Sequence, residues 1–348
     1  MKQKVYIIVL NYNNWADTIA CAESILANDY TNYQLIIVDN DSPDDSMTYI
    51  RQWAEGTLES WTPPSDPLRR CTFPPQRKPV DHIFHEEDES LEQACLHDHR
   101  VVLIQSRKNG GYSAGNNVGI RYAKARGDFD YLWILNNDTV IEKDALVKLV
   151  DFANRHEPRI GLIGTTLLFY DAPDKIQAFG AAFNRFIAVQ KHYLSHETYS
   201  EKIVQEFDQK KLDYIIGASM LMTRRCIDKI GVMPEEYFIY FEEIDIATNC
   251  RRNGFDFAIC TEAVVYHKES VAIKQENQSR SAFSDFYAMR NRVIVTQKYH
   301  THLLPFVYGG LFLSMLLRLK RGDFESVKNI VRIMKTPPSK IQALEFTS

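Results

Sequence analysis

The feature that most constrains the fold is an apolar segment that ends abruptly in three polar residues. Residues 131–135 are apolar throughout, and Asn136, Asn137 and Asp138 follow directly. A short apolar run with polar ends is typical of a strand buried on both faces, as in a parallel α/β sheet. Side chains just past the carboxyl end of such a strand face the crevice where α/β sheets bind ligands. We therefore expect this segment to be a central strand that ends in a binding site.

Similar apolar segments alternate with helical patterns along the first half of the chain. Strands are predicted at residues 5–10, 34–38, 101–105 and 131–135, and helices at 15–27, 42–54, 109–125 and 143–154. Ser42 is the expected N-cap of the second helix. Shorter strands are predicted at 160–170, 211–222, 257–260 and 263–267, and helices at 223–230, 244–253 and 281–299. This order predicts an α/β fold with a mostly parallel central sheet flanked by helices, and a helical C-terminal extension.

Residues 56–99 interrupt the alternation with a proline-rich insertion. It holds six of the thirteen prolines and an acidic run at 86–89. Loops of this length are usually functional or partly disordered. Its histidines are expected to be solvated rather than to bind a metal; they are His82, His85, His97 and His99.

The bulk properties narrow the class of protein. A net charge of −4 and a pI near 6.2 argue against a nucleic-acid-binding surface. The six cysteines form no C-x-x-C pair, which favours reduced thiols and a cytoplasmic protein. The N-terminal apolar run is too short for the core of a signal peptide.

The C-terminal part of the chain is apolar and basic. Residues 303–319 are apolar apart from Ser314 and Arg318, and are interrupted by Pro305 and two glycines, so they fall short of a membrane span. From residue 286 to the end there are ten Lys or Arg against three acidic residues. This pattern predicts contact with an anionic membrane surface through residues 303–335. A packing helix or an oligomer contact is the alternative.

Four polar clusters follow predicted strands or begin helices, at residues 11–13, 39–41, 109–117 and 136–138. In a doubly wound sheet they converge on one cleft. Asp39 is placed to accept hydrogen bonds from a base or ribose, and the glycines after Asn109 allow close approach of a ligand. The glycine spacing fits neither a dinucleotide-binding fingerprint nor a P-loop. A nucleotide held through its base and ribose is therefore favoured.

Two further sets of residues suggest chemistry. Asn136 and Asp138 are two positions apart and can offer oxygens to one Mg²⁺ or Mn²⁺ ion, to which His267 can add a nitrogen. The alternative is a strand end with turn-forming residues. Glu242, Glu243 and Asp245 form an acidic cluster in which mutual repulsion raises pKa values, as suits a general base. The alternative is a helix N-terminus that favours acidic residues for its dipole.

Six motifs in this order resemble the family 2 glycosyltransferases, and most closely their rhamnosyltransferase-like branch. The motifs are V-L-N-Y-N (9–13), V-D-N (38–40), N-G-G-Y-S-A-G-N-N-V-G (109–119), N-N-D (136–138), F-E-E-I-D (241–245) and Y-H-K-E-S (266–270), and R-N-R (290–292) also fits. The resemblance implies a GT-A fold and inverting transfer from a nucleoside-diphosphate sugar. It also implies a glycosyltransferase domain at 1–280, with the insertion at 56–99, and a helical extension at 281–348.

The resemblance also implies roles for individual residues. The nucleotide-sugar site comprises Asn11, Asn13, Asp39, Asn40, Asn109, Gly110, Gly115, Asn116, Asn136 and Asn137. Asp138 and His267 stand at the metal site, where Asn136 replaces the usual first aspartate of D-x-D. Glu243 falls on the position of the catalytic base, with Asp245 and Glu242 as further candidates.

The predicted reaction moves a sugar from a dTDP- or UDP-sugar, with dTDP-rhamnose among the candidates, to a hydroxyl of a glycan or lipid-linked saccharide in cell-surface polysaccharide synthesis. The expected location is cytoplasmic, at the inner face of the membrane. A non-catalytic nucleotide-sugar binding module is the alternative. A phosphatase of the D-x-D-x-[TV] type lacks its nucleophile, since Asn stands at 136, and the glycine spacing disfavours a dinucleotide oxidoreductase.

Overall fold

A computed structural model describes residues 2–94, 98–268 and 281–347 of the chain. Its main sheet has ten strands in the order β3-β4-β2-β1-β5-β11-β7-β12-β6, with β8 paired to β7. These strands are β1 (Val5–Asn11), β2 (Tyr33–Asp39), β3 (His82–Glu86), β4 (Val101–Gln105), β5 (Tyr131–Asn136), β6 (Thr139–Ile141), β7 (Ile160–Phe169), β8 (Ile176–Ala178), β11 (Ser219–Thr223) and β12 (Asp256–His267). A separate hairpin pairs β9 (Ala181–Asn184) with β10 (Val189–His192).

The sheet is parallel from β3 to β5 and mixed beyond it. β11 runs antiparallel between β5 and β7, whereas β12 is parallel to β7 and antiparallel to β6. The predicted α/β architecture with a mostly parallel central sheet is therefore confirmed. As expected from its uniformly apolar sequence, β5 lies at the centre of the sheet and is buried along its length up to Leu135.

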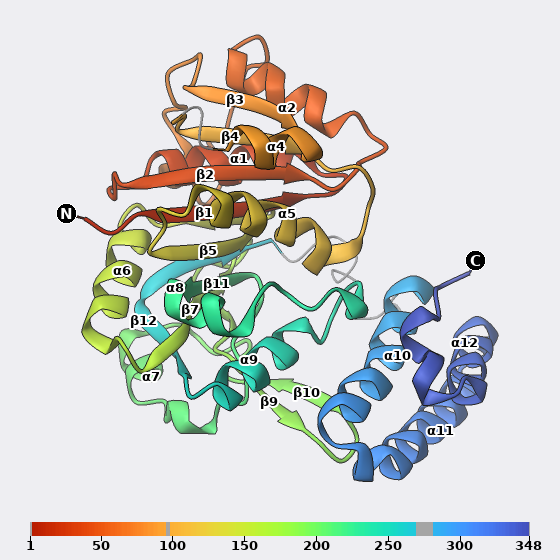
Figure 1. Ribbon diagram of the computed structural model, residues 1–348. Helices are drawn as coiled ribbons and strands as arrows, with labels where there is room; N and C mark the ends of the chain where they lie inside the picture. Colours follow the sequence, from red (N-terminus) through yellow and green to blue (C-terminus); the bar gives the residue numbers. More distant parts are fainter. Residues whose placement is uncertain (1, 95–97, 269–280, 348) are drawn as a thin grey trace.

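Helices cover both faces of this sheet (Figure 1). They are α1 (Trp15–Leu26), α2 (Ser46–Glu55), α3 (Arg69–Thr72), α4 (Glu87–Gln93), α5 (Gly111–Arg126), α6 (Ala145–His156), α7 (Glu201–Gln205), α8 (Arg224–Ile230), α9 (Glu242–Arg252), α10 (Ala282–Tyr299), α11 (Leu304–Lys320) and α12 (Phe324–Lys335). Short 3-10 turns lie at Gln209–Lys211, Glu235–Tyr237, Thr301–Leu303 and Pro338–Ala343. Along β1, alternate side chains enter two separate cores, because successive residues of a strand point to opposite faces.

The insertion differs from the expected loop, because it contributes structure to the sheet. Its residues His82–Glu86 form β3, which pairs in parallel with β4 and extends the sheet by one edge strand. His85 is only 2% exposed, so it is part of the packing rather than solvated as predicted. The many prolines of the insertion favoured the prediction of a loop, but β3 begins after the last of them. His97 lies outside the described residues.

Three predicted boundaries also need correction. The second helix begins at Ser46 rather than at Ser42, because Asp45 adopts a left-handed conformation with φ of 56° immediately before it. The predicted strand at 211–222 is confined to β11, and the two strands predicted at 257–267 are one strand with a bulge between Cys260 and Val264. Chain irregularities of this kind depend on strand pairing, which local sequence does not reveal.

The C-terminal helices α10, α11 and α12 pack together at one side of the sheet (Figure 1). Pro305 lies in the first turn of α11, where it is tolerated, and Gly309 and Gly310 are accommodated within the helix. The expected interruption is therefore absent from the described structure. Residues 301–320 form one helical stretch that is long and apolar enough to cross a membrane by those two criteria alone. The five cysteines in the described ranges are free and buried.

Candidate active site

The carboxyl ends of β1, β2, β4 and β5 meet around Asp39. Strand pairing places Asn11 beside Asp39, and Leu10 beside Asn136. The Asp39 carboxylate is 1% exposed; one oxygen accepts hydrogen bonds from Asn11 Nδ2 (2.6 Å) and Ser42 Oγ (2.7 Å). The other accepts from the Ser42 backbone N–H and from Gln105 Nε2, both at 3.0 Å. Asp39 therefore organises this edge, and its contact with a base or ribose stays a prediction.

Neighbouring asparagines join the same network. Asn137 Nδ2 lies 3.0 Å from Thr18 Oγ1 and 3.3 Å from Asn11 Oδ1. Asn13 has a positive φ of 54°, and its backbone N–H donates to Ser42 Oγ at 3.0 Å. The network brings the predicted residues of β1 and of the segment after β5 together at one edge of the sheet.

The glycine-rich segment before α5 lies against Asn40. Asn40 Nδ2 donates to Asn109 Oδ1 at 2.9 Å and to the Gly111 carbonyl oxygen at 3.2 Å. The Oδ1 atoms of Asn40 and Asn116 are buried, and neither has a hydrogen-bond partner among the described residues. Buried acceptors of this kind are usually satisfied, so these two oxygens are candidates for contact with donor groups of a ligand.

Two glycines of this segment have different roles. Gly110 is the N-cap of α5. Gly115 is inside α5 and faces β1, and a Cβ there would lie 2.4 Å from Leu10 Cδ1. Gly115 therefore allows α5 to pack closely against β1, and its approach to a nucleotide stays a prediction.

Asp138 and His267 form a pair at the junction of β5, β6 and β12. Asp138 Oδ1 lies 3.0 Å from His267 Nε2, and His267 Nδ1 lies 2.8 Å from Gln177 Oε1. Burial acts to raise the pKa of Asp138, but the His267 ring outweighs it and the pKa is lowered. Gln177 orients the imidazole from the side opposite Asp138, in the manner of outer-shell partners of metal-binding histidines.

The atoms near this pair fit a divalent cation. Asn136 Oδ1 is buried without a partner among the described residues, and Asn136 Nδ2 lies 3.4 Å from His267 Nε2. A carboxylate, an imidazole nitrogen and an amide oxygen are all suitable ligands for Mn²⁺. Within the described ranges no group of three or more His, Cys, Asp or Glu side chains is arranged to hold a metal. A cation at this pair would thus need oxygens from a bound ligand.

The acidic pair at the start of α9 lies against the backbone that precedes β11. A Cβ on Gly217 would meet Glu243 Oε1 at 2.9 Å, so only glycine leaves room for this carboxylate. Burial raises the pKa of both Glu242 and Glu243, and the charge of Glu243 raises that of Glu242 further. Backbone groups of Gly217 and Phe241 act to lower the pKa of Glu243.

Asp245 has a different environment. Its carboxylate accepts hydrogen bonds from the hydroxyls of Tyr237 (2.7 Å) and Tyr299 (2.6 Å), and it pairs with Lys298 Nζ at 2.7 Å. It is 2% exposed. These bonds fasten α9 to α10 and to the turn before α9.

Tyr112, which the motif analysis did not single out, connects the two halves of the site. Its hydroxyl donates to the Gly217 carbonyl oxygen at 2.9 Å. Burial, followed by the charges of Glu242, Glu243 and Asp138, raises the pKa of Tyr112. Glu243 lies against Gly217, and the next residue, Ala218, accepts the Asn136 backbone N–H at 3.0 Å, so the acidic pair and the Asn136–Asp138 segment lie near each other.

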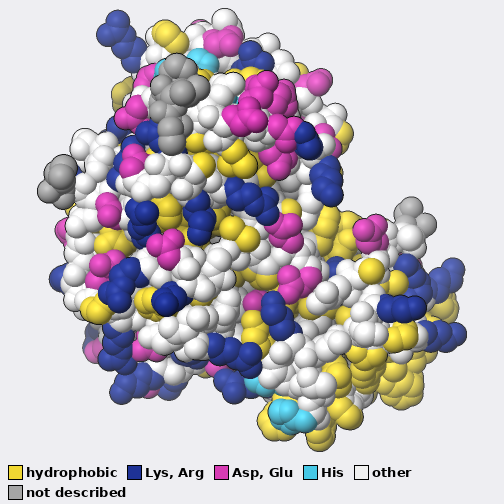
Figure 2. Space-filling model, in the orientation of Figure 1, with side chains coloured by type: hydrophobic (Ala, Val, Ile, Leu, Met, Phe, Trp, Pro, Cys, Tyr) yellow, Lys and Arg dark blue, Asp and Glu magenta, His cyan; other side chains and the backbone are white. Residues whose placement is uncertain are grey.

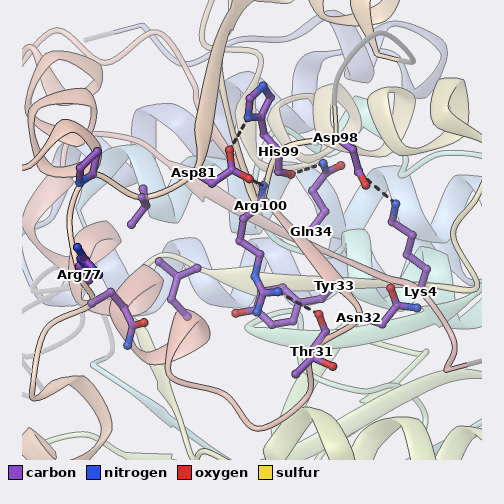
Figure 3. Close-up of a pocket in the computed structure, with 14 residues that line it drawn as sticks. Lys4, Thr31, Asn32, Tyr33, Gln34, Arg77, Asp81, Asp98, His99 and Arg100 are labelled. Atoms are coloured by element: carbon purple, nitrogen blue, oxygen red, sulfur yellow. Dashed lines mark hydrogen bonds and ion pairs between the residues drawn. The ribbon is translucent and has the colours of Figure 1, made fainter.

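A hollow of about 680 Å³ lies at the opposite, amino end of the strands (Figure 3). Most of its charged groups contact protein partners: Lys4 pairs with Asp98, His99 contacts Asp81, and Arg100 donates to the Thr31 carbonyl oxygen. None of the residues predicted to bind or react lines this hollow. We therefore assign the candidate chemistry to the carboxyl edge of the sheet.

Known proteins resemble the chain in sequence. The hexosyltransferase Agl10 of low-salt glycan biosynthesis from Haloferax volcanii is 24% identical over 254 residues, which are 68% of this chain and 76% of that protein. The dTDP-rhamnosyl transferase RfbF of Shigella flexneri is 20% identical over 237 residues, 66% of this chain and 75% of that protein.

Solved structures resemble it in fold. The mannosyltransferase PcManGT of Pyrobaculum calidifontis, in complex with GDP-Man and Mn²⁺, aligns with a TM-score of 0.53 at 12% identity and covers 99% of this chain and 79% of its own. S. aureus TarS 1-349 in complex with UDP-GlcNAc gives a TM-score of 0.51 at 12% identity, covering 98% and 84%. These neighbours are glycosyltransferases of the GT-A fold, in agreement with the predicted architecture.

Two family descriptions match the chain itself. "Glycosyl transferase family 2" matches residues 6–65, and "Glycosyltransferase like family 2" matches residues 86–285, which is more than half of the sequence. The second match contains the glycine-rich segment, the Asn136–Asp138 segment, the acidic pair and His267. These residues lie at the carboxyl edge of the sheet, and the match covers more than half of the sequence. The chain therefore belongs to the family 2 glycosyltransferases.

Proposed function

We propose that the chain transfers a sugar from a dTDP- or UDP-sugar to a hydroxyl of a glycan or lipid-linked saccharide, with inversion at the anomeric carbon. The observation that carries this proposal is the presence of two unlike groups next to the backbone of Gly217 and Ala218. Glu243, a buried carboxylate with a raised pKa, packs against Gly217. The segment that carries Asp138, which pairs with His267, is bonded to Ala218 through the Asn136 backbone N–H. An inverting transfer needs one group to take a proton and another to stabilise a leaving diphosphate.

Glu243 is the proposed base. Its pKa is raised by burial, which makes the carboxylate a better proton acceptor than a solvated one. In the proposed step the acceptor oxygen forms a bond to the anomeric carbon while the bond from that carbon to the diphosphate breaks. The hydroxyl proton passes to Glu243. Attack opposite the leaving group gives inversion, as in the related logic of inverting glycosidases.

Asp138, His267 and Asn136 are the proposed holders of Mn²⁺ or Mg²⁺. When bound, such a cation supplies positive charge that offsets the charge of the departing diphosphate. Two structural neighbours support this assignment, because Mn²⁺ is present in the complex of PcManGT and in the crystal structure of GalNAc-T7 with UDP and GalNAc. Asp138 supplies the negative charge, Gln177 keeps the His267 ring oriented, and Asn136 offers its unpartnered oxygen.

A thermal-shift screen tests the donor class and the metal together. UDP, dTDP, GDP and their sugars are added with and without Mn²⁺, and the shift in Tm reports binding. We expect the largest shift from a dTDP or UDP ligand with Mn²⁺, followed by slow release of nucleoside diphosphate from its sugar. Binding without any release of diphosphate, with or without acceptor saccharides, would favour the alternative of a non-catalytic binding module.

We also propose that the enzyme works at the cytoplasmic face of an anionic membrane, to which the C-terminal helices bind. Along α11 the exposed positions are apolar at helical spacing, including Phe306 (57% exposed), Leu313 (60%) and Leu317 (52%). The opposite side of the helix is buried through Val307 and Leu311. Because that side is packed into the protein, α11 would lie along the membrane surface rather than cross it.

Neighbouring residues extend this apolar face and ring it with positive charge. Phe186, from the turn between β9 and β10, is 59% exposed and stacks edge-on to Phe306 with ring centroids 6.0 Å apart. Figure 2 shows apolar side chains gathered over the C-terminal helices with Lys and Arg around them. Exposed cations at the end of α11 and on α12 are Lys320, Arg321, Lys328 and Lys335. Such cations complement anionic lipids.

The other end of the face also carries positive charge, on Arg185 and Arg252 near His300. Two-fold pairing of this face with a second copy would therefore bring like charges together. This argues for a bilayer rather than for a second chain as the partner.

Vesicle flotation tests the membrane contact. We expect binding to phosphatidylglycerol-containing vesicles, weaker binding to pure phosphatidylcholine, and loss of both in Leu313→Glu/Leu317→Glu. Trp61→Ser, which removes another exposed aromatic residue (67% exposed) outside the C-terminal helices, is the matched control. A concentration-dependent dimer that the double variant abolishes, without any vesicle binding, would contradict the proposal.

A further inference from the structure

The turn that leads into the acidic pair has an unusual backbone. Phe238, Tyr240 and Phe241 have φ angles of 65°, 69° and 76°. Residues other than glycine rarely adopt such angles, which persist only where the surrounding structure holds them. Glu242 and Glu243 follow immediately as the first residues of α9. The direction in which Glu243 points therefore depends on what holds this turn.

Two adjacent residues of α10 hold most of it. Asn291 Nδ2 lies 2.9, 2.8 and 2.9 Å from the carbonyl oxygens of Tyr237, Ile239 and Tyr240. Arg290 donates through its guanidinium to the carbonyl oxygens of Glu236 and Tyr237. The remaining carbonyl between them, that of Phe238, accepts the Tyr112 backbone N–H at 2.7 Å. Every backbone carbonyl from 236 to 240 thus has a donor from outside the turn.

Arg290 also donates hydrogen bonds to the segment near the C-terminus. Its Nε donates to the Ile341 carbonyl oxygen at 3.2 Å and its Nη2 to that of Gln342 at 3.0 Å. Arg290 is 3% exposed and Asn291 is fully buried. One side chain therefore joins the turn before α9 to the segment near the C-terminus, about fifty residues away on each side of Arg290.

We propose that Arg290 and Asn291 are positioning residues for Glu243. The C-terminal helical unit, formed by α10, α11 and α12, would then help to hold the catalytic base in place. The role assigned to Glu243 rests on the proposed transfer reaction, whereas the support of the turn does not. Loss of either side chain would leave carbonyl groups of the turn without donors. The turn would then relax toward ordinary φ angles and move the base away from the acceptor hydroxyl.

The test compares Asn291→Ala and Arg290→Lys with a matched control. Asn329→Ala removes another buried asparagine of the same helical unit, whose Nδ2 has no hydrogen-bond partner among the described residues. Hydrogen–deuterium exchange of peptides covering 236–246 and 109–116 reports the turn directly. Turnover and donor affinity are measured with the nucleotide sugar identified by thermal shift.

We expect faster exchange in both peptides for Asn291→Ala, a smaller change for Arg290→Lys, and none for Asn329→Ala. We also expect kcat to fall by about 100-fold in Asn291→Ala, as for other misplacements of a catalytic group by about 1 Å, with donor affinity unchanged. If Asn291→Ala does not fold, Arg290→Lys, which keeps the charge, carries the comparison.

The outcomes separate the two proposals. A changed exchange pattern with no turnover in the wild-type protein would defeat the transfer reaction but keep the support of the turn. An active wild-type protein in which the variants leave both exchange and kcat unchanged would overturn the positioning role. Equal losses of kcat in Asn291→Ala and Asn329→Ala would also overturn it, because they would indicate a general effect of core damage.

Discussion

Two carboxylates two positions apart, Glu243 and Asp245, are candidates for the base, and their surroundings predict different effects of the same chemical change. Glu243→Gln and Asp245→Asn each replace a carboxylate by an amide of the same shape. In the first case the carboxylate is buried with a raised pKa, so a neutral group is tolerated by the fold. In the second case the Asp245 carboxylate accepts hydrogen bonds from two tyrosine hydroxyls and forms an ion pair with Lys298.

The structure sets the expected size of each effect. Asp245→Asn loses the ion pair and at least one hydroxyl bond, and each hydrogen bond to a charged group contributes about 1.5–3 kcal/mol. Lys298 keeps its contact with Glu236 and is partly exposed, which reduces the loss. We therefore expect a destabilisation of about 2–4 kcal/mol, seen as a fall of about 3–5 °C in Tm for a chain of this length. Glu243→Gln should leave Tm unchanged but lower kcat by about 10²- to 10⁴-fold, the usual contribution of a general base.

The assay measures thermal unfolding and release of nucleoside diphosphate from the donor for both variants. Donor binding, followed by thermal shift, should persist in Glu243→Gln. The reasoning is refuted if Glu243→Gln retains its turnover while Asp245→Asn loses turnover at an unchanged Tm, because the base would then be Asp245.

Three further predictions follow from the same site. Burial raises the pKa of Glu243, and the base must be deprotonated to act, so kcat/KM should increase with pH through a midpoint above the ordinary glutamate value of about 4.3. Glu243→Gln should lack this increase, and a midpoint at or below the ordinary value in the wild-type protein would contradict the assignment. Asp138→Ala should abolish the Mn²⁺-dependent part of nucleoside-diphosphate binding in titration calorimetry, and unchanged binding would place the metal elsewhere. Gly111→Ala should lower Tm and kcat more than Gly127→Ala. Both glycines have positive φ, but only at Gly111 would a Cβ meet the Phe238 carbonyl oxygen, at 2.3 Å. Equal effects of the two variants in thermal unfolding would reject the importance of this contact.

Much of the fold follows from local patterns. The apolar strands are predicted because a strand buried on both faces must be apolar along its length, and β1, β2, β4 and β5 are found close to their expected bounds. The convergence of Asn11, Asp39 and Asn136 is predictable for a related reason, since parallel strands end at one edge. The motifs around these residues were sufficient to identify the family.

Other features depend on contacts that no local pattern contains. The proline-rich insertion becomes an edge strand only because β4 offers it a free edge to pair with. Gly115 resembles a ligand-binding glycine in sequence, and only the tertiary structure shows that it also allows α5 to pack closely against Leu10.

The sequence by itself determined which segments are buried, where the polar strand ends gather and to which family the chain belongs, because these depend on spacing and residue type along the chain. Only the tertiary structure shows how the surroundings of the two candidate acids differ. Asp245 is occupied by Tyr299 and Lys298, and the turn before Glu243 is held by Asn291, all more than forty residues away. The chemical character of a carboxylate depends on its neighbours in space, and those neighbours are set by packing between distant segments.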